Sequence, residues 1–137
     1  MKIYIAGPLH TEGERILLEK IDVICKELGF ETYLPHRDGQ LLAKDRSNLK
    51  QIFERDCEGV DKCSIVIAVL NGFDVDSGTS WEMGCAFSKE KPIIGYINHI
   101  LISDPQKQLN PMILGSLNHL AGSLDELKQI LSKFKSQ

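Results

Sequence analysis

The chain has 137 residues, of which 42% are hydrophobic and 26% charged, and its formal net charge is −3. This length is enough for one domain with a sizeable core, so a single domain over residues 1–137 is predicted. No apolar run approaches the length of a membrane span, and no cluster of Lys and Arg could neutralise phosphates. A membrane and a nucleic acid polymer are therefore not expected as partners.

The first residues of the chain are typical of a strand. Lys2–Ala6 is short and apolar, and Met1–Pro8 lacks the apolar stretch of a signal peptide. A helix should follow, because Thr11 and Glu14 form a capping-box pattern and Gly29 is suited to end it. Phe30–Leu34 is predicted as the second strand, and the polar segment His36–Arg46 as a loop.

The same alternation continues to the end of the chain. Asn48–Val60 is predicted as a helix, with Ile52, Phe53 and Cys57 facing inward, and Asn110–Asn118 fits a short helix or a strand equally well. The remaining predicted elements are the strands Ser64–Leu70 and Pro92–Ile97, the helices Gly78–Lys89 and Leu124–Phe134, and the loop Asn98–Gln108. Such alternation predicts an α/β fold with a parallel sheet and helices on both of its faces.

Cysteines and histidines give no sign of a metal or a disulfide. The four cysteines form no CxxC pair, which with no export signal favours reduced thiols in a cytoplasmic protein. The histidines (His10, His36, His99 and His119) are dispersed, and each is expected on the surface or in a loop rather than as a ligand. Neither GxGxxG nor a P-loop occurs, so no cofactor and no metal ion are predicted.

Polar residues gather just after the predicted buried strand Ser64–Leu70. The segment Asp74–Phe87 carries three carboxylates and two glycines where this strand gives way to a helix. In open α/β sheets, ligands bind at the carboxyl ends of the strands. Glu82 should lie about one turn into the helix, where a glutamate can act as nucleophile, acid or base. The segment is therefore predicted to be an active site.

A purely structural interpretation of this segment is also available. Thr79–Glu82 fits the capping-box pattern, and Asp76 or Ser77 could be a simple N-cap. A cap needs only one acid, however, whereas here acids flank Gly78 on both sides. The whole segment therefore favours chemistry. Asp76 is expected near the start of the first helix, around Thr11.

Four separated pieces of the chain are similar to one protein family. They are Lys2–Leu9 with Thr11 and Glu14–Arg15, Phe53–Asp56 with Val60–Asp61, Asp74–Phe87, and Asn110–Met112. The chain resembles the nucleoside 2-deoxyribosyltransferases and the related nucleoside 5′-monophosphate N-glycosidases. Pro111 departs from the leucine usual in this family, and Asn98–Gln108 has no counterpart. The role of that loop is left open, with control of substrate choice as one hypothesis.

The resemblance implies a flavodoxin-like three-layer sandwich, with a mostly parallel sheet of four to five strands, and a ping-pong reaction. By position, it implies Glu82 as the nucleophile, Asp56 as the acid and base toward the nucleobase, and Tyr4 as the residue that orients Glu82. The implied substrate-binding residues are Asp76 at the 5′-hydroxyl, Gly7, Ser77, Gly78, Met112, and Asn110, which would reach a neighbouring subunit's site in a homo-oligomer.

The chemistry of N-glycosidic cleavage gives independent reasons for a pair of acids. The sugar gains oxocarbenium character that a carboxylate stabilises and captures, and the leaving base needs a proton. Asp56 precedes the third strand and Glu82 follows it, so both can face one crevice. Alternatives remain open: Asp56 as a solvated acid, Tyr4 as a core aromatic, and Asn110 as a turn residue.

The predicted function is transfer of 2-deoxyribose between nucleobases, with a nucleoside or nucleotide and a free nucleobase as substrates. A 5′-monophosphate N-glycosidase is the nearest alternative. Asp76 argues against it, because a carboxylate repels a phosphate, whereas the neighbouring Ser77 keeps it open. A non-catalytic nucleotide sensor is a third possibility, which would not need the acid pair. Base specificity, and the choice between transfer and hydrolysis, are left open.

Overall fold

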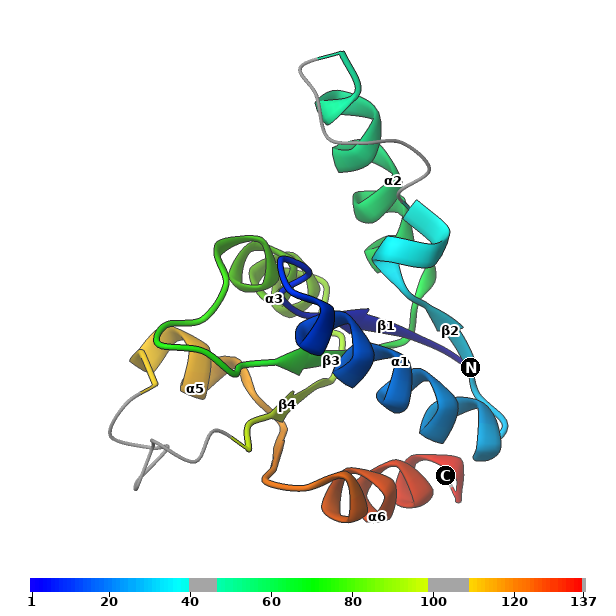
Figure 1. The fold of residues 1–137 in the computed structure, drawn as a ribbon. Helices are drawn as coiled ribbons and strands as arrows, with labels where there is room; N and C mark the ends of the chain where they lie inside the picture. Colours follow the sequence, from blue (N-terminus) through cyan, green and yellow to red (C-terminus); the bar gives the residue numbers. More distant parts are fainter. Residues whose placement is uncertain (40–46, 99–108, 137) are drawn as a thin grey trace.

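The computed structural model describes residues 1–39, 47–98 and 109–136 (Figure 1). The predicted loops therefore lie partly outside the described residues, at 40–46 and 99–108. The strands are β1 (Lys2–Ala6), β2 (Glu31–Tyr33), β3 (Ile65–Val69), β4 (Ile93–Tyr96) and β5 (His119–Ala121). The helices are α1 (Glu12–Glu27), the π-helical turn η1 (Pro35–Gly39), α2 (Leu49–Lys62), α3 (Ser77–Ser88), α5 (Pro111–Ser116) and α6 (Leu124–Lys135).

The strands form one parallel sheet in the order β2-β1-β3-β4-β5. In its register, Tyr4 of β1 lies opposite Tyr33 of β2 on one side and Val66 of β3 on the other. Helices cover both faces of the sheet (Figure 1). The predicted flavodoxin-like α/β fold is thereby confirmed.

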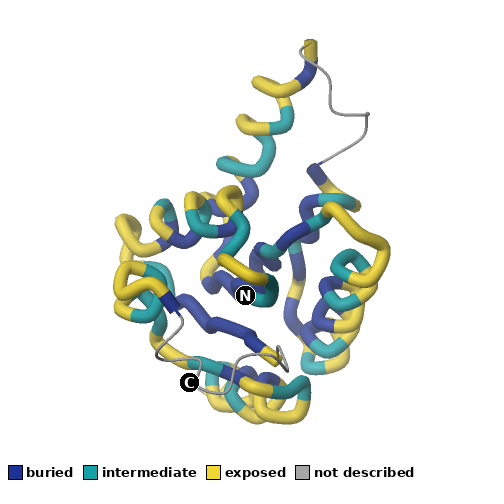
Figure 2. Tube along the Cα trace, turned by 60° about the vertical axis from the view of Figure 1, so that its left-hand side comes forward, coloured by how far each residue is buried: buried dark blue, intermediate teal, exposed yellow. Residues whose placement is uncertain are grey.

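Two hydrophobic cores lie on opposite faces of the sheet, whose strands form the buried interior seen in Figure 2. On one face, α1 and α6 pack on Ile3 and Ile5. On the other, α2 and α3 pack on Tyr4 and Ala6. Side chains alternate between the faces of a strand, so Tyr4 is directed to the α2–α3 side.

The residues predicted to begin and end helices make the expected capping contacts. The Thr11 side chain accepts from the Glu14 amide, and the Glu14 carboxylate accepts in return from the Thr11 amide. Gly29 follows α1 at φ +83°, a conformation that glycine adopts without strain. Ser123 caps α6 by accepting from the Glu126 amide. In the described part of the chain, none of the helices combines the length and apolarity needed to cross a bilayer.

Three local predictions need correction or completion. Residues 35–39 form the turn η1 rather than loop, because Arg37 anchors them by donating to Asp22 (3.0 Å) and to Asp38 (2.6 Å). Phe53 does not face the core, since 54% of it is exposed. The segment Asn110–Asn118, predicted as either a helix or a strand, contains the helix α5. The strand β5 was not predicted, because three residues are too few to show the alternation of a strand.

Candidate active site

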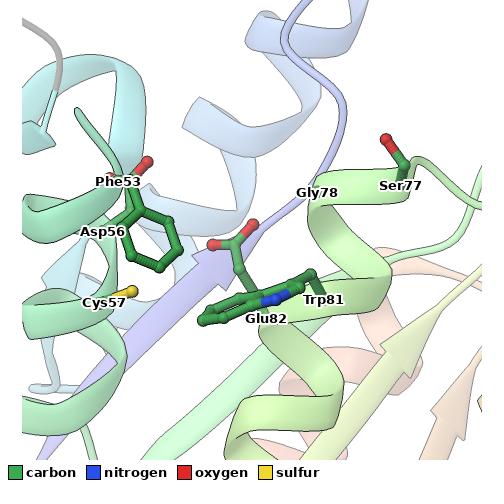
Figure 3. Close-up of a pocket in the computed structure, with 7 residues that line it drawn as sticks. All are labelled: Phe53, Asp56, Cys57, Ser77, Gly78, Trp81 and Glu82. Atoms are coloured by element: carbon green, nitrogen blue, oxygen red, sulfur yellow. The ribbon is translucent and has the colours of Figure 1, made fainter. Parts of the chain in front are cut away.

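A cavity of about 330 Å³ lies between α2 and α3, beside the carboxyl edge of the sheet. Its lining comes from these two helices: Phe53, Asp56 and Cys57 from α2, and Ser77, Gly78, Trp81 and Glu82 from α3. Figure 3 shows the Glu82 carboxylate pointing into the space between the helices, with the α2 residues opposite. The two predicted acids therefore share one crevice.

Glu82 does not cap its helix. The N-cap of α3 is Asp76, whose side chain accepts from the Thr79 amide at 3.0 Å, so the capping interpretation of Thr79–Glu82 is wrong. Glu82 lies more than a turn further along the helix. Its Oε2 is buried and has no hydrogen-bond partner among the described residues. A buried carboxyl oxygen without a partner is costly, and such exceptions call for a functional explanation.

The surroundings of Glu82 favour its protonated form. Burial raises its pKa to about 8, the negative charges of Asp56 and Asp76 act in the same direction, and hydrogen bonding to Tyr4 opposes them. Tyr4 is fully buried, and its own pKa is raised by burial and then by Glu82 and Asp56. Its hydroxyl, like Glu82 Oε2, makes no hydrogen bond of good geometry within the described residues, although Tyr4 is close enough to act on the Glu82 carboxylate.

Asp56 is part-buried, and a hydrogen bond from another element holds its carboxyl group. The Tyr33 hydroxyl donates to Asp56 Oδ1 at 3.1 Å. Asp56 is thus not simply a solvated acid on the surface of α2. The charge of Asp56 also contributes to the raised pKa of Glu82, so the two carboxyls interact.

Asp76 stands at the start of α3 and close to the start of α1, as predicted. Its Oδ2 accepts from the amide and the hydroxyl of Thr79, and its Oδ1 lies 3.1 Å from His10 Nε2. Burial raises the pKa of Asp76, but these hydrogen bonds and the charge of His10 outweigh it and leave the pKa below its usual range. Sequence reasoning did not pair His10 with Asp76, because 66 residues separate them.

Two aromatic side chains that line the cavity were not predicted as site residues from the sequence. Phe53 and Trp81 meet edge to face, with ring centroids 5.4 Å apart, and about half of each is exposed. Both positions could have been suspected, because Phe53 lies one helical turn before Asp56 and Trp81 adjoins Glu82. Aromatic faces of this kind can stack on the flat ring of a nucleobase.

Of the predicted substrate-binding residues, Ser77 and Gly78 line this cavity, whereas Asp76 and three others do not. Gly7 follows β1, where an added Cβ would come within 2.6 Å of Leu18, so close packing accounts for the glycine. Asn110 is the N-cap of α5 and accepts from the Met112 amide at 2.9 Å. Met112 lines a second cavity, of about 400 Å³, between α3 and α5.

The site combines two interacting carboxyls, two tyrosines behind them and an apolar aromatic wall. This arrangement can supply one carboxyl as a proton donor and the other as a nucleophile. Among residues 1–39, 47–98 and 109–136, no group of three or more His, Cys, Asp or Glu side chains is arranged to hold a metal ion.

Comparisons with known proteins point in one direction. The family model described as nucleoside 2-deoxyribosyltransferase matches residues 3–112. An uncharacterized protein of Schizosaccharomyces pombe is 31% identical over 103 residues, which cover 69% of this chain and 48% of that protein. The chain thus spans about half the length of this curated relative.

Solved structures share the fold. A 2-deoxyribosyltransferase from Bacillus psychrosaccharolyticus superposes with a TM-score of 0.79 at 23% identity, over 93% of this chain and 90% of that one. A CMP N-glycosidase from Clostridium botulinum gives a TM-score of 0.63 at 20% identity, over 98% of this chain and 99% of that one. At such identities the likeness establishes the fold alone.

Proposed function

The chain belongs to the nucleoside 2-deoxyribosyltransferase family, and we propose that it transfers 2-deoxyribose between nucleobases through a covalent intermediate on Glu82. The observation that carries this proposal is the meeting of Glu82 and Asp56 in one aromatic-walled cavity. Neither acid is needed for a protein that only binds nucleotides. Their convergence favours catalysis over sensing.

In the first half-reaction, a Glu82 carboxylate oxygen attacks C1′ of the nucleoside. The C1′–N bond breaks, its electron pair stays on the base nitrogen, and the base takes a proton from the Asp56 carboxyl. The negative charge of Glu82 stabilises the oxocarbenium character at C1′ before the new C–O bond forms. The products are a glycosyl ester on Glu82, a neutral base and an Asp56 carboxylate.

In the second half-reaction, a nitrogen of another base attacks C1′ and displaces the Glu82 carboxylate. Asp56 accepts the proton that this nitrogen loses, which restores both acids. Water attacking in place of the base would give free deoxyribose. Transfer therefore depends on an incoming base occupying the cavity and excluding water, a task suited to the apolar walls of Phe53 and Trp81.

The raised pKa of Glu82 fits this scheme when the two acids are treated as a pair. Like charges in one cavity disfavour double ionisation, so the pair tends to hold one proton. With that proton on Asp56, one of the smaller contributions that raise the pKa of Glu82 is removed, while burial remains the largest. Tyr4 acts in the same direction, by favouring the Glu82 carboxylate. The reactive form thus has an acidic Asp56 and an anionic Glu82.

Asp76 is proposed to accept a hydrogen bond from the sugar 5′-hydroxyl, with Ser77, Gly78 and Gly7 contributing to that end of the site. Its Oδ1 is held by His10, which is largely exposed and stands at the start of α1. A hydroxyl can replace or share this contact. In the same scheme, Asn110 and Met112 serve a neighbouring subunit's site, because both lie away from this chain's own cavity.

A 5′-monophosphate N-glycosidase is the second candidate, and His10 is the observation that favours it. A protonated His10 would offset the charge of Asp76 and attract a phosphate. Two measurements separate the candidates. Incubation with deoxyinosine, with and without adenine, should give deoxyadenosine only when adenine is present. The kcat/KM for deoxyinosine should exceed that for its 5′-monophosphate, and Asp76→Ser should shift this ratio toward the monophosphate. A wild-type preference for the monophosphate would replace the transferase proposal with the glycosidase.

A further inference from the structure

We propose that Tyr33 is a positioning residue for the acid Asp56, holding its Oδ1 as a hydrogen-bond acceptor while the Asp56 carboxyl gives its proton to the leaving base. This inference rests on the proposed function, since it concerns how the same site protonates a base. Tyr33 itself does not line the cavity that holds the two acids. It acts on the reaction only through Asp56.

The hydroxyl of Tyr33 has two acceptors within reach, of which Asp56 Oδ1 is the nearer. It lies 3.1 Å from Asp56 Oδ1 and 3.3 Å from the Arg55 carbonyl oxygen, both on α2. The contact joins the end of β2 to the middle of α2, across 23 residues of sequence. This contact therefore links the Asp56 side chain to the sheet, so its position does not depend on α2 alone.

The ring of Tyr33 is fixed by the neighbouring strand. Tyr33 lies opposite Tyr4 in the parallel register of β2 and β1, and the two rings stack with centroids 5.1 Å apart and planes 11° from parallel. Tyr4 in turn acts on Glu82. The two tyrosine rings thus stack on each other next to the two acids. Tyr33 donates to Asp56, and Tyr4 lies close to Glu82.

Two glycines make room for this ring. Gly59 follows Asp56 by almost one turn of α2, and an added Cβ there would lie 2.8 Å from Tyr33 Cε1 and 2.9 Å from Cζ. At Gly39, in η1, an added Cβ would overlap both the Tyr33 hydroxyl and Asp56 Oδ1. Backbone on two sides and Tyr4 on a third leave the ring little freedom to move away from Asp56.

The direction of this hydrogen bond selects the oxygen that carries the proton. The Tyr33 hydroxyl has a raised pKa, because of burial and then the charge of Asp56, so it stays protonated and donates. An oxygen that accepts a hydrogen bond is favoured as the carbonyl oxygen of a neutral carboxyl, so the contact with Tyr33 disfavours protonation of Asp56 at Oδ1. After proton transfer, the same hydrogen bond stabilises the carboxylate that must accept a proton in the second half-reaction.

Tyr33→Phe tests this role, because it removes the hydroxyl and keeps the stacked ring. The test compares deoxyinosine, whose base must be protonated to leave, with an N7-methylated 2′-deoxypurine nucleoside, whose base is already cationic. We expect kcat/KM for deoxyinosine to fall about tenfold, the order expected for one lost hydrogen bond to a charged group. The methylated nucleoside should change by less than about twofold, since it does not need the proton.

Tyr96→Phe is the matched control. Tyr96 is a buried tyrosine in β4 that packs in the core on the opposite face of the sheet, against the α1 and α6 side. It loses the same atom without touching either acid, so both substrates should react as in the wild type. Thermal unfolding of the two variants should differ little, because each keeps its ring.

The outcomes of this test distinguish failure of the Tyr33 role from failure of the proposed function. Selective loss with the poor leaving group supports the Tyr33 role. Equal slowing of both nucleosides, or no slowing, in a wild type that cleaves deoxyinosine overturns the Tyr33 role alone. A wild-type protein that cleaves neither nucleoside overturns the proposed function, and the Tyr33 role with it.

Discussion

The two sides of helix α3 differ in chemistry although they share one element. Toward α2, the helix presents Trp81 and Glu82 to a cavity that also holds Asp56. Toward α5, it presents Met83 and Phe87 to a slightly larger cavity, and no Asp, Glu, His, Lys or Arg is among the described residues that line it. Adjacent residues of one helix therefore line one cavity that contains two acids and another whose described lining carries no charged side chain.

This difference shows how the predicted site residues divide. The acids meet within one chain, whereas Asn110 and Met112 belong to the α5 side. Met112 is 81% exposed and Phe87 60% exposed, and both line the cavity beside α5. The residues that the family resemblance groups together therefore do not all line one cavity of this chain. The contrast yields four predictions.

The largest effect is expected on the reactive side, at Glu82. Glu82→Gln removes the nucleophile while keeping the shape of the side chain, so transfer should fall by at least about 10³-fold. A 2′-fluoro-2′-deoxynucleoside should leave a sugar on Glu82 of the wild type, detectable by mass spectrometry of peptides. Thermal unfolding serves as the control, and the variant should stay folded because Glu82 caps nothing. Near-normal turnover would exclude the covalent mechanism.

Asp56→Asn should give the next largest effect. An amide cannot donate the acidic proton, so deoxyinosine should react about 10²-fold more slowly, within the range typical of general acid catalysis. A nucleoside whose base leaves without protonation should be affected far less. Steady-state kinetics on both substrates measure the contrast. If the two rates fell together, Asp56 would be a binding residue and the acid would have to be sought elsewhere.

The sequence was sufficient for the parts of this site that follow from local rules. The strand Lys2–Ala6, the Thr11 capping box and the position of Glu82 after a buried strand follow from alternation, caps and the usual place of ligands in parallel sheets. The contacts of His10 with Asp76 and of Tyr33 with Asp56 could not be predicted in this way. Each joins residues distant in sequence, so only the packing of α1, β2 and α2 around the sheet brings them together.

A smaller effect is expected on the apolar side. If Asn110 completes a neighbour's site, Asn110→Ala should lower transfer about tenfold and the protein should sediment as a dimer or larger. The loss of one polar contact to the substrate corresponds to this magnitude. Mixing Asn110→Ala with Glu82→Ala chains should restore part of the activity, since some sites would then combine two intact contributions. A fully active monomer would confine the reaction to the α2–α3 cavity of one chain.

Tyr4→Phe should have the smallest effect, and it should show in the pH dependence. The reactive form requires the Glu82 carboxylate, so kcat/KM rises with pH as Glu82 loses its proton. The nearby Tyr4 hydroxyl favours that carboxylate and opposes the effect of burial on the pKa of Glu82, which is about 8. Removing the hydroxyl should raise this pKa further and move the rising limb to higher pH, by up to about one unit. Activity near pH 7 should then drop several-fold and recover at higher pH, because one pKa unit corresponds to tenfold in the ionised fraction. Tyr96→Phe provides the control, with an unmoved limb. A limb that stays in place in Tyr4→Phe, or moves to lower pH, would show that Tyr4 acts by packing, and the reactive side of α3 would then depend on its two acids alone.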